Sequence, residues 1–434
     1  PPGQLMAAGR LDIPTILVIG GYQPHGKIDG EDVDVEELWI GTVGEAMGKP
    51  GKFSAEEMSF QAIRGPGVCA GMATANTMHC VVEALGMCIP GSAPVRAKSD
   101  KMYDNALAAA KRIVGMVEED VTPRKIMTKQ AFRNAVATVL AVSGSINAIK
   151  HLQAIAMECD GDVDVFELWD EMSRKVPVLT AVRPSGDVRI EEFEDAGGAA
   201  SILKRLSPIL DTGPLTCTGK TLAENLDALP DGDTEIIRPL DRPISEGPSI
   251  AILKGSLAPE SAVVKLGIRD GSRPESFDGP ARVFNNTQDA LDAVKEGRLQ
   301  KGEVLVLRGQ GLKGGPAMGG GASIVLFAIY LAGLAKETAF VTDGQLSGLC
   351  LKGLTVAEVA PEGAIDSPLA RVQDGDRIVI DVAKRHLDLM VPVEELAKRP
   401  APSDEFPIDA TGWLSVYRKI VQPMSTGAVL TEKK

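Results

Sequence analysis

The sequence of 434 residues is poor in aromatic side chains and cationic clusters, and it has no long apolar run. Aromatic residues make up only 4%, which argues against a surface that stacks nucleic-acid bases. The 46 basic residues are scattered and outnumbered by 59 acidic ones, giving a formal charge of −13, so we expect no nucleic-acid partner. The longest uncharged apolar run, residues 322–335, would span roughly 21 Å as a helix, against about 30 Å for a bilayer core. We therefore expect no membrane partner and predict an internal helix there.

Cysteine is also scarce, and the six residues form no Cys-x-x-Cys pair and no disulfide framework for a chain of this length; they are Cys69, Cys80, Cys88, Cys159, Cys217 and Cys350. This favours a reducing compartment, either the cytoplasm or, in a eukaryote, an organelle matrix. The first residues, Pro-Pro-Gly-Gln-Leu-Met, lack an initiator Met and a signal-peptide pattern. We interpret this start as a point partway through a longer protein.

The length and the hydrophobic pattern predict an α/β protein of two domains. A short apolar run at 14–21 predicts a buried strand. Apolar positions at three- and four-residue spacing then predict helices over 53–63, 70–88, 101–119 and 129–158. The second half predicts strands at 249–253, 261–267, 281–284, 303–308, 338–342 and 377–382, with helices at 287–297 and 322–335. We therefore expect a helix-rich α/β N-terminal domain, residues 1–240, and a β-rich, barrel-like C-terminal domain, residues 241–434. The linker would lie in the Pro-, Asp- and Gly-rich stretch 228–248. The octets DVDVEELW (32–39) and DVDVFELW (162–169) each predict an Asp-capped helix start.

The first chemical candidate is Cys69, which lies in a glycine-flanked loop just before a predicted helix. Such a position exposes a sulfur atom, and the helix N-terminus would lower the pKa of the thiol. A buried structural cysteine is the alternative. A catalytic cysteine nucleophile is less well supported, because none of the four histidines lies in a recognisable partner motif.

The second candidate is the glycine-rich stretch 311–321, GLKGGPAMGGG. Glycine-rich turns present backbone N–H groups to anions. The Gly-Lys-Ser/Thr ending of a nucleotide-binding loop is absent, since Gly314 follows Lys313. The pattern favours backbone approach to a small anionic substrate over nucleotide binding.

The third candidate is Ser347, which follows an apolar strand and a tight Asp343-Gly344 turn. The alternative is an ordinary surface hydroxyl in a turn. No Gly-x-Ser-x-Gly elbow is present, which argues against a serine hydrolase.

Together these segments resemble one family in sequence and in order. The runs that carry the resemblance are GVCAGMATANTMHCVVEALGMCIPGS (67–92), CTGKTLAENL (217–226), IRPLDRPIS (237–245), AILKGSLAPESAVVK (251–265), FDGPARVF (277–284) and TDGQLSG (342–348). They look like the dihydroxy-acid dehydratase and 6-phosphogluconate dehydratase family. The resemblance implies a small hydroxy-acid substrate, an active site between two domains near a dimer interface, and a homodimer or homotetramer.

The resemblance also implies the roles of two residues. The family's Cys-Asp-Lys signature continues into a Pro-Gly that matches Pro2-Gly3, so the Cys, Asp and Lys would fall before residue 1. Cys69 is then the one cluster ligand present, for a [2Fe-2S] or [4Fe-4S] iron–sulfur cluster whose iron acts as Lewis acid on the departing hydroxyl. Ser347 matches the family's base, an alkoxide that removes the proton next to the carboxylate. A serine hydroxyl is a weak acid, so cations and backbone donors must stabilise its ionised form.

The chain departs from the family at three points. Gln345 replaces an Arg, and Leu349 and Cys350 replace a small residue and a Ser or Thr. The family's Mg²⁺-binding Glu falls where this chain has Gly319, Gly320 and Gly321, and glycine offers no carboxylate to Mg²⁺.

The sequence therefore predicts a dehydratase that converts a 2,3-dihydroxy acid to a 2-oxo acid, as in branched-chain amino-acid biosynthesis. Two alternatives stay open. One is a sugar-acid dehydratase acting on an aldonate or on 6-phosphogluconate, and the other is a catalytically impaired homologue that serves as a binding or scaffold protein.

Overall fold

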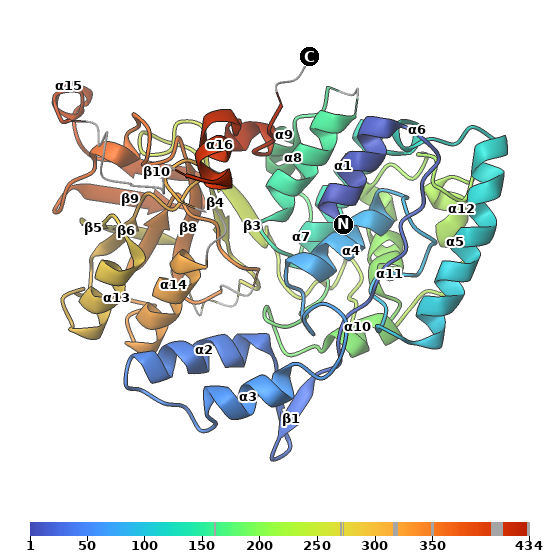
Figure 1. Ribbon diagram of the computed structural model, residues 1–434, viewed down its shortest axis with the longest axis horizontal. Helices are drawn as coiled ribbons and strands as arrows, with labels where there is room; N and C mark the ends of the chain where they lie inside the picture. The colour runs from blue at the N-terminus through green and yellow to red at the C-terminus, as the bar shows by residue number, and fades with distance from the viewer. Residues whose placement is uncertain are drawn as a thin grey trace. The chain divides into compact units, whose positions relative to one another are not determined.

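The computed structural model describes residues 1–159, 162–269, 271, 273–315, 320–348, 351–400 and 411–431. The chain forms two compact units (Figure 1). The first unit comprises Pro1–Leu38 and Glu56–Ser249, and the second comprises Trp39–Ala55 and Ile250–Lys434. The boundary predicted at 240/241 lies shortly before Ser249, and nothing in the sequence indicated that the segment Trp39–Ala55 belongs with the second unit.

The first unit is helix-rich. Its helices are α1 (Pro2–Leu11), the start of α2 (Val35–Ala46), α3 (Ala55–Ala62), α4 (Thr74–Ala84), α5 (Asp100–Glu118), α6 (Pro123–Ile126), α7 (Lys129–Ala141), α8 (Ala148–Glu158), α9 (Val165–Met172), α10 (Ile190–Asp195), α11 (Gly198–Leu206), the 3₁₀ helix η1 (Ser207–Ile209) and α12 (Leu222–Asp227). Strands β1 (Gly26–Ile28) and β2 (Glu31–Val33) form an antiparallel pair. Helix α5 is capped by Ser99, whose side chain accepts from Met102 N at 3.2 Å. The Asp-capped start predicted for the octet 162–169 is confirmed at Asp164, which accepts from Glu167 N at 3.0 Å.

Helix α7 is the centre of the first unit. It is buried along nearly its whole length, including Phe132 and Leu140, and it contacts α4, α8, α9 and α11. A helix that is buried on nearly all sides is stable only when other elements surround it. The loop before α4, which carries Cys69, therefore leads into a helix that packs directly on this core.

Two predictions about the first unit are wrong. The run 14–21 is not a strand, because no strand among the described residues pairs with it; its backbone bonds include Leu17 N to Met87 O at 2.8 Å and Val68 N to Gly21 O at 3.0 Å. The predicted helix over 129–158 is broken into α7 and α8. The helix ends because Ser143 adopts a left-handed φ of 48°. At Gly144 a Cβ would lie 2.8 Å from the Thr77 side chain, which favours glycine there.

The second unit is built on an eight-stranded sheet in the order β10-β9-β5-β6-β7-β8-β4-β3. Its strands are β3 (Ile250–Leu253), β4 (Ser261–Lys265), β5 (Ser276–Phe284), β6 (Val304–Leu307), β7 (Ala339–Thr342), β8 (Leu354–Ala360), β9 (Arg377–Asp381) and β10 (His386–Leu389). Strands β5, β6, β7 and β8 run parallel, and the other pairs are antiparallel. A bridge between Lys254 and His386 links the two edges of the sheet. The α/β class and the barrel-like sheet are confirmed, although β8 and β10 had no predicted counterpart.

The interior of this barrel-like sheet is filled by alternate side chains, among them Val304, Val306, Val341, Ile378 and Ile380. Strands β6 and β7 are buried at every position, unlike an ordinary strand with one solvated face. Helices α13 (Thr287–Lys295) and α14 (Gly321–Leu331) contact each other and lie side by side next to these strands (Figure 1). The remaining helices are η2 (Leu369–Arg371), α15 (Val393–Leu396), α16 (Trp413–Ile420) and η3 (Met424–Thr426).

The predicted internal helix at 322–335 is confirmed as α14, whose Val325, Leu326 and Phe327 are buried. It ends at Leu331 because Gly333 turns the chain with a φ of 76°. Within the part of the chain that the structure describes, no helix combines the length and the apolar character needed to cross a membrane.

Candidate functional site

The turn that carries Ser347 is anchored by the buried carboxylate of Asp343, at the carboxyl end of β7. Asp343 is 1% exposed and accepts from Gly309 N and Gln310 N, both at 2.9 Å, and from Gly363 N at 2.8 Å. Burial raises the pKa of this carboxyl group, and the three N–H donors act in the opposite direction. Because these donors lie in the loops after β6 and β8, one side chain ties together the ends of three parallel strands.

Ser347 itself is half-buried, and the chain on both sides of it is held by side chains from other elements. Its backbone N–H donates to the Ser323 hydroxyl on α14 at 3.2 Å. The Gly348 carbonyl accepts from the Lys265 ammonium on β4 at 2.8 Å. The helix predicted at 322–335 therefore supports this turn through Ser323. The assignment of Ser347 as a base stays a prediction.

The glycine-rich loop does bind an anion, but the anion belongs to the protein. Glu362 accepts from the N–H groups of Leu312 at 2.6 Å, Lys313 at 2.7 Å and Gly314 at 2.8 Å. Burial raises the pKa of Glu362, and the carboxylate of Asp343 acts in the same direction. The expectation that this stretch of backbone approaches an anionic substrate is therefore wrong for residues 312–314, because these donors are already used.

The local structure favours glycine at positions 320 and 321, where the resemblance led us to expect an Mg²⁺-binding Glu. Gly320 precedes α14 with a φ of 79°, in the left-handed region that favours glycine. A Cβ at Gly321 would lie 2.4 Å from the Thr287 hydroxyl. Neither position accommodates a carboxylate side chain without rearrangement. Gly319, Leu349 and Cys350 lie outside the described residues.

A cavity of about 270 Å³ lies beside the Asp343 anchor in the second unit. Its lining includes the cations Lys313 and Lys419 and the carboxylates of Glu358 and Glu362. Glu358 is 2% exposed, has a left-handed φ of 54° and donates its N–H to Gly344 O at 3.1 Å. Strained residues of this kind are characteristic of functional sites. Sequence reasoning missed the cavity because its walls come from distant stretches of the chain.

In the first unit, Cys69 lies in the loop before α4, as predicted, and is half-buried. The Asn76 amide fixes this loop by donating to the carbonyls of Cys69 and Gly71, both at 2.8 Å. Burial raises the pKa of the Cys69 thiol, and Asp34 raises it further. The expected lowering is therefore wrong for the protein without metal, because α4 begins only at Thr74 and the dipole effect decays within one turn.

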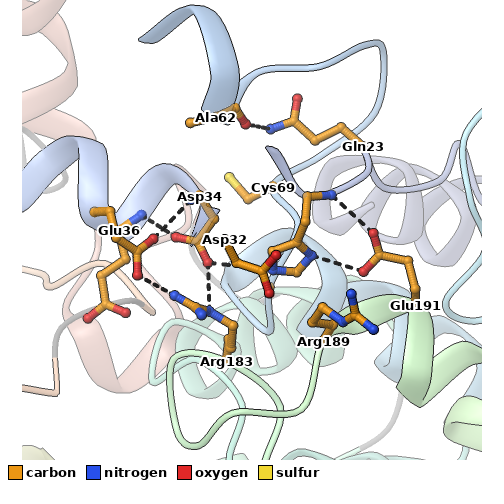
Figure 2. A network of polar contacts seen from close by, with 12 residues as sticks. Gln23, Asp32, Asp34, Glu36, Ala62, Cys69, Arg183, Arg189 and Glu191 are labelled. Atoms are coloured by element: carbon orange, nitrogen blue, oxygen red, sulfur yellow. Dashed lines mark hydrogen bonds and ion pairs between the residues drawn. The ribbon is translucent and has the colours of Figure 1, made fainter. Parts of the chain in front are cut away.

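Figure 2 shows an acidic network near Cys69 that the sequence reasoning did not identify as a site. Asp34, 6% exposed, accepts from Arg183 Nε at 3.1 Å and from Glu36 N at 2.7 Å. Arg183 also pairs with Glu37. The octet at 32–39 was the only signal in the sequence, and its prediction of an aspartate at the start of a helix is confirmed by Asp34 before α2.

The network continues through His25, whose side chain is buried. Its Nδ1 lies 2.9 Å from Glu191 Oε2, its backbone N donates to the same carboxylate at 3.0 Å, and its Nε2 lies 3.8 Å from Asp34. Burial alone would raise the pKa of Glu191, but these contacts lower it to about 2. Glu191 is therefore ionised at neutral pH.

The described residues do not make a complete metal centre. Within the described ranges, no group of three or more His, Cys, Asp or Glu side chains is arranged to hold a metal ion. Cys80, Cys88 and Cys217 are buried, and burial raises the pKa of each thiol, as in structural cysteines. A cluster needs several thiolates. Cys69 by itself does not make an iron–sulfur site in the first unit. In the second unit, Gly320 and Gly321 offer no carboxylate to Mg²⁺.

Comparison with known proteins gives matches along nearly the whole chain. The N-terminal model of the dihydroxy-acid/6-phosphogluconate dehydratases matches residues 1–225, and the corresponding C-terminal model matches residues 235–428. The dihydroxy-acid dehydratase of Methanothermobacter thermautotrophicus is 40% identical over 99% of this chain and 77% of the relative. Dihydroxy-acid dehydratase 1 of Methanosarcina acetivorans is 39% identical over 99% of this chain and 78% of its own length. The dihydroxy-acid dehydratase of Sulfurisphaera tokodaii is 38% identical over 99% of this chain and 77% of its own length.

Proposed function

This chain belongs to the dihydroxy-acid/6-phosphogluconate dehydratase family, and from that membership we propose that it is a hydro-lyase converting a 2,3-dihydroxy acid to a 2-oxo acid. The observation that carries the proposal is the 40% identity to a dihydroxy-acid dehydratase over 99% of the chain. Similarity of this extent covers both units, including the loop of Cys69 and the turn of Ser347.

In the proposed reaction Ser347 acts as the base. Its Oγ, as an alkoxide, takes the proton from C2, and the electrons of the C2–H bond form a C2=C3 double bond as the C3–O bond breaks. The departing hydroxyl takes that proton from the Ser347 hydroxyl and leaves as water, which returns Ser347 to its alkoxide form. The resulting enol becomes the 2-oxo acid by transfer of its hydroxyl proton to C3. The fixed Asp343 anchor and the contact from Ser323 support this role, because proton transfer requires the hydroxyl to be held close to the reacting carbon.

We further propose that Cys69 is a ligand of the iron–sulfur cluster that the family implies. Its half-buried position and its fixed loop support this role. The described residues supply no complete ligand set for the cluster. Mg²⁺ is not part of the proposal, since Gly320 and Gly321 offer no carboxylate.

The proposal also includes a reducing compartment such as the cytoplasm and a homodimer or homotetramer. Sugar-acid dehydration is the first alternative, and the family's joint name includes 6-phosphogluconate dehydratases. The second alternative is a binding or scaffold protein that has lost catalysis, which the glycines at 320 and 321 favour.

One experiment separates these functions. The full-length protein is purified without oxygen, its iron and sulfide are measured, and it is incubated with 2,3-dihydroxy-3-methylbutanoate, arabinonate, xylonate and 6-phosphogluconate. The proposal expects bound iron and sulfide and fastest conversion of the branched dihydroxy acid. Faster turnover of a sugar acid would replace the substrate assignment, and metal-free protein without turnover on any acid would favour the binding protein.

A further inference from the structure

Lys265 is a buried cation next to the catalytic turn, and nothing in the resemblance assigned it a role. It is the last residue of β4 and only 7% exposed. The residues before it, Val263 and Val264, are 1% and 0% exposed. The Lys265 ammonium donates to the carbonyl of Gly348 at 2.8 Å.

Burying an ammonium group removes it from water at a considerable cost, so a lysine at the end of an apolar strand requires a compensating interaction or a function. The acceptor at 2.8 Å is a neutral carbonyl, and it belongs to the residue that directly follows Ser347. A packing role alone would be met by a methionine or leucine of similar volume. The contact of the amino group with the turn is an interaction that offsets this cost.

The contact completes the fixation of Ser347. Before the serine, Asp343 is bound by three backbone N–H groups, and the N–H of Ser347 itself is bound by Ser323. After the serine, Lys265 binds the carbonyl of Gly348. The chain is thus held on both sides of the hydroxyl, which restricts the positions that Oγ can reach. The positive charge of Lys265 also favours an ionised oxygen in this turn, since a nearby cation stabilises an anion in a poorly hydrated site.

We propose that Lys265 is the positioning residue for Ser347: it holds the Ser347-Gly348 segment in place and supports the alkoxide form of the base. The inference rests on the proposed function for its catalytic consequence, but the fixation of the turn does not. Lys265 makes no contact with substrate in this role, so its loss affects kcat and leaves KM nearly unchanged.

The test compares three variants of the full-length protein. Lys265→Met removes the charge and the donor at similar length, and Lys265→Arg keeps both. Lys254→Met is the matched control, because it removes an exposed lysine just beyond the neighbouring strand β3. Each variant is measured for thermal unfolding, for iron content, for kcat and KM, and for amide hydrogen exchange of a peptide covering 339–348.

Lys265→Met is expected to lower kcat about 10²-fold, the effect of a misplaced catalytic group, with KM changed by less than about threefold. Amide exchange in 339–348 is expected to rise at least about tenfold, while Lys265→Arg and Lys254→Met stay close to the parent. A folded Lys265→Met with parental kcat and parental exchange overturns the proposal. If Lys265→Met does not fold, Lys265→Arg decides, and a folded arginine variant that loses both turnover and protection overturns it. If the parent dehydrates no acid, the proposed function fails, and amide exchange alone decides whether Lys265 holds the turn.

Discussion

The Asp343 anchor makes a quantitative prediction about stability. Replacing Asp343 with Ala removes the acceptor of three backbone N–H groups, those of Gly309, Gln310 and Gly363. Each N–H left buried without a partner costs about 1–3 kcal/mol, which gives an upper range of about 3–9 kcal/mol. Burial raises the pKa of Asp343, so its carboxylate is itself desolvated, and removing it recovers part of this cost. We therefore expect Asp343→Ala to lower the free energy of unfolding by about 3–4 kcal/mol. Asp343→Asn keeps one acceptor oxygen and should lower it by about 2 kcal/mol.

The assay is urea unfolding followed by circular dichroism, with Asp366→Asn as control. Asp366 lies in the same unit and pairs with Arg371, but its side chain is 70% exposed, so its change should cost less than about 1 kcal/mol. Proton exchange at C2 of the substrate is measured in parallel, because loosening the strand ends should also displace Ser347. The reasoning is refuted if Asp343→Ala is as stable as Asp366→Asn, or if it exchanges the C2 proton at the parental rate.

Three further predictions concern the base, the cluster ligand and a buried acid. Ser347→Ala should leave folding and iron content unchanged but lower turnover at least about 10²-fold and abolish C2 proton exchange in deuterated solvent; parental exchange in an otherwise active preparation would identify another base. Cys69→Ser should remove the visible absorbance and iron of anaerobically prepared protein, and bleaching by Cys80→Ser or Cys88→Ser but not by Cys69→Ser would contradict the ligand assignment. Burial raises the pKa of Glu83 from 4.5 to about 7, so the folded state holds this proton more tightly than the unfolded state does. The free energy of unfolding should therefore fall as pH rises from about 4.5 to 7, by roughly 3 kcal/mol. Glu83→Gln should flatten that slope in urea unfolding between pH 5 and pH 8, and a slope equal to that of the parent would show that other groups cause it.

Local patterns predicted most of the elements, because helix and strand periodicity records which side chains are buried. These patterns were insufficient where an element depends on a partner that is distant in the sequence. The apolar run at 14–21 resembles a strand, yet no strand in the described part of the chain pairs with it. Conversely, β8 was missed because Glu358 interrupts its apolar sequence, and β10 because it has only four residues, two of them polar.

The chemistry of the site was predictable only in part, for the same reason. The positions of Cys69 and Ser347 in loops next to regular elements follow from local sequence. The partners of the other groups are far away in the chain: Asp34 and Arg183 are separated by 149 positions, and Lys265 and Gly348 by 83. The glycine-rich loop shows the limit clearly. Its anion-binding backbone could be recognised, but not that Glu362 already fills it.

The path of the chain between the two units determines how the protein can be divided. The chain passes from one unit to the other at Leu38–Trp39, at Ala55–Glu56 and at Ser249–Ile250. The segment Trp39–Ala55 supplies real contacts to the second unit: Lys49 Nζ donates to Leu331 O at 3.0 Å, and Ala46 O accepts from Lys295 Nζ at 3.1 Å. A cut at the obvious junction, 249/250, would therefore leave the first unit whole on the amino-terminal fragment but divide the second unit between the two fragments. The amino-terminal fragment would carry a helix whose packing partners α13 and α14 lie on the other piece. A fragment of the second unit that is intended to fold alone must instead carry residues 39–55 joined to the barrel-like sheet.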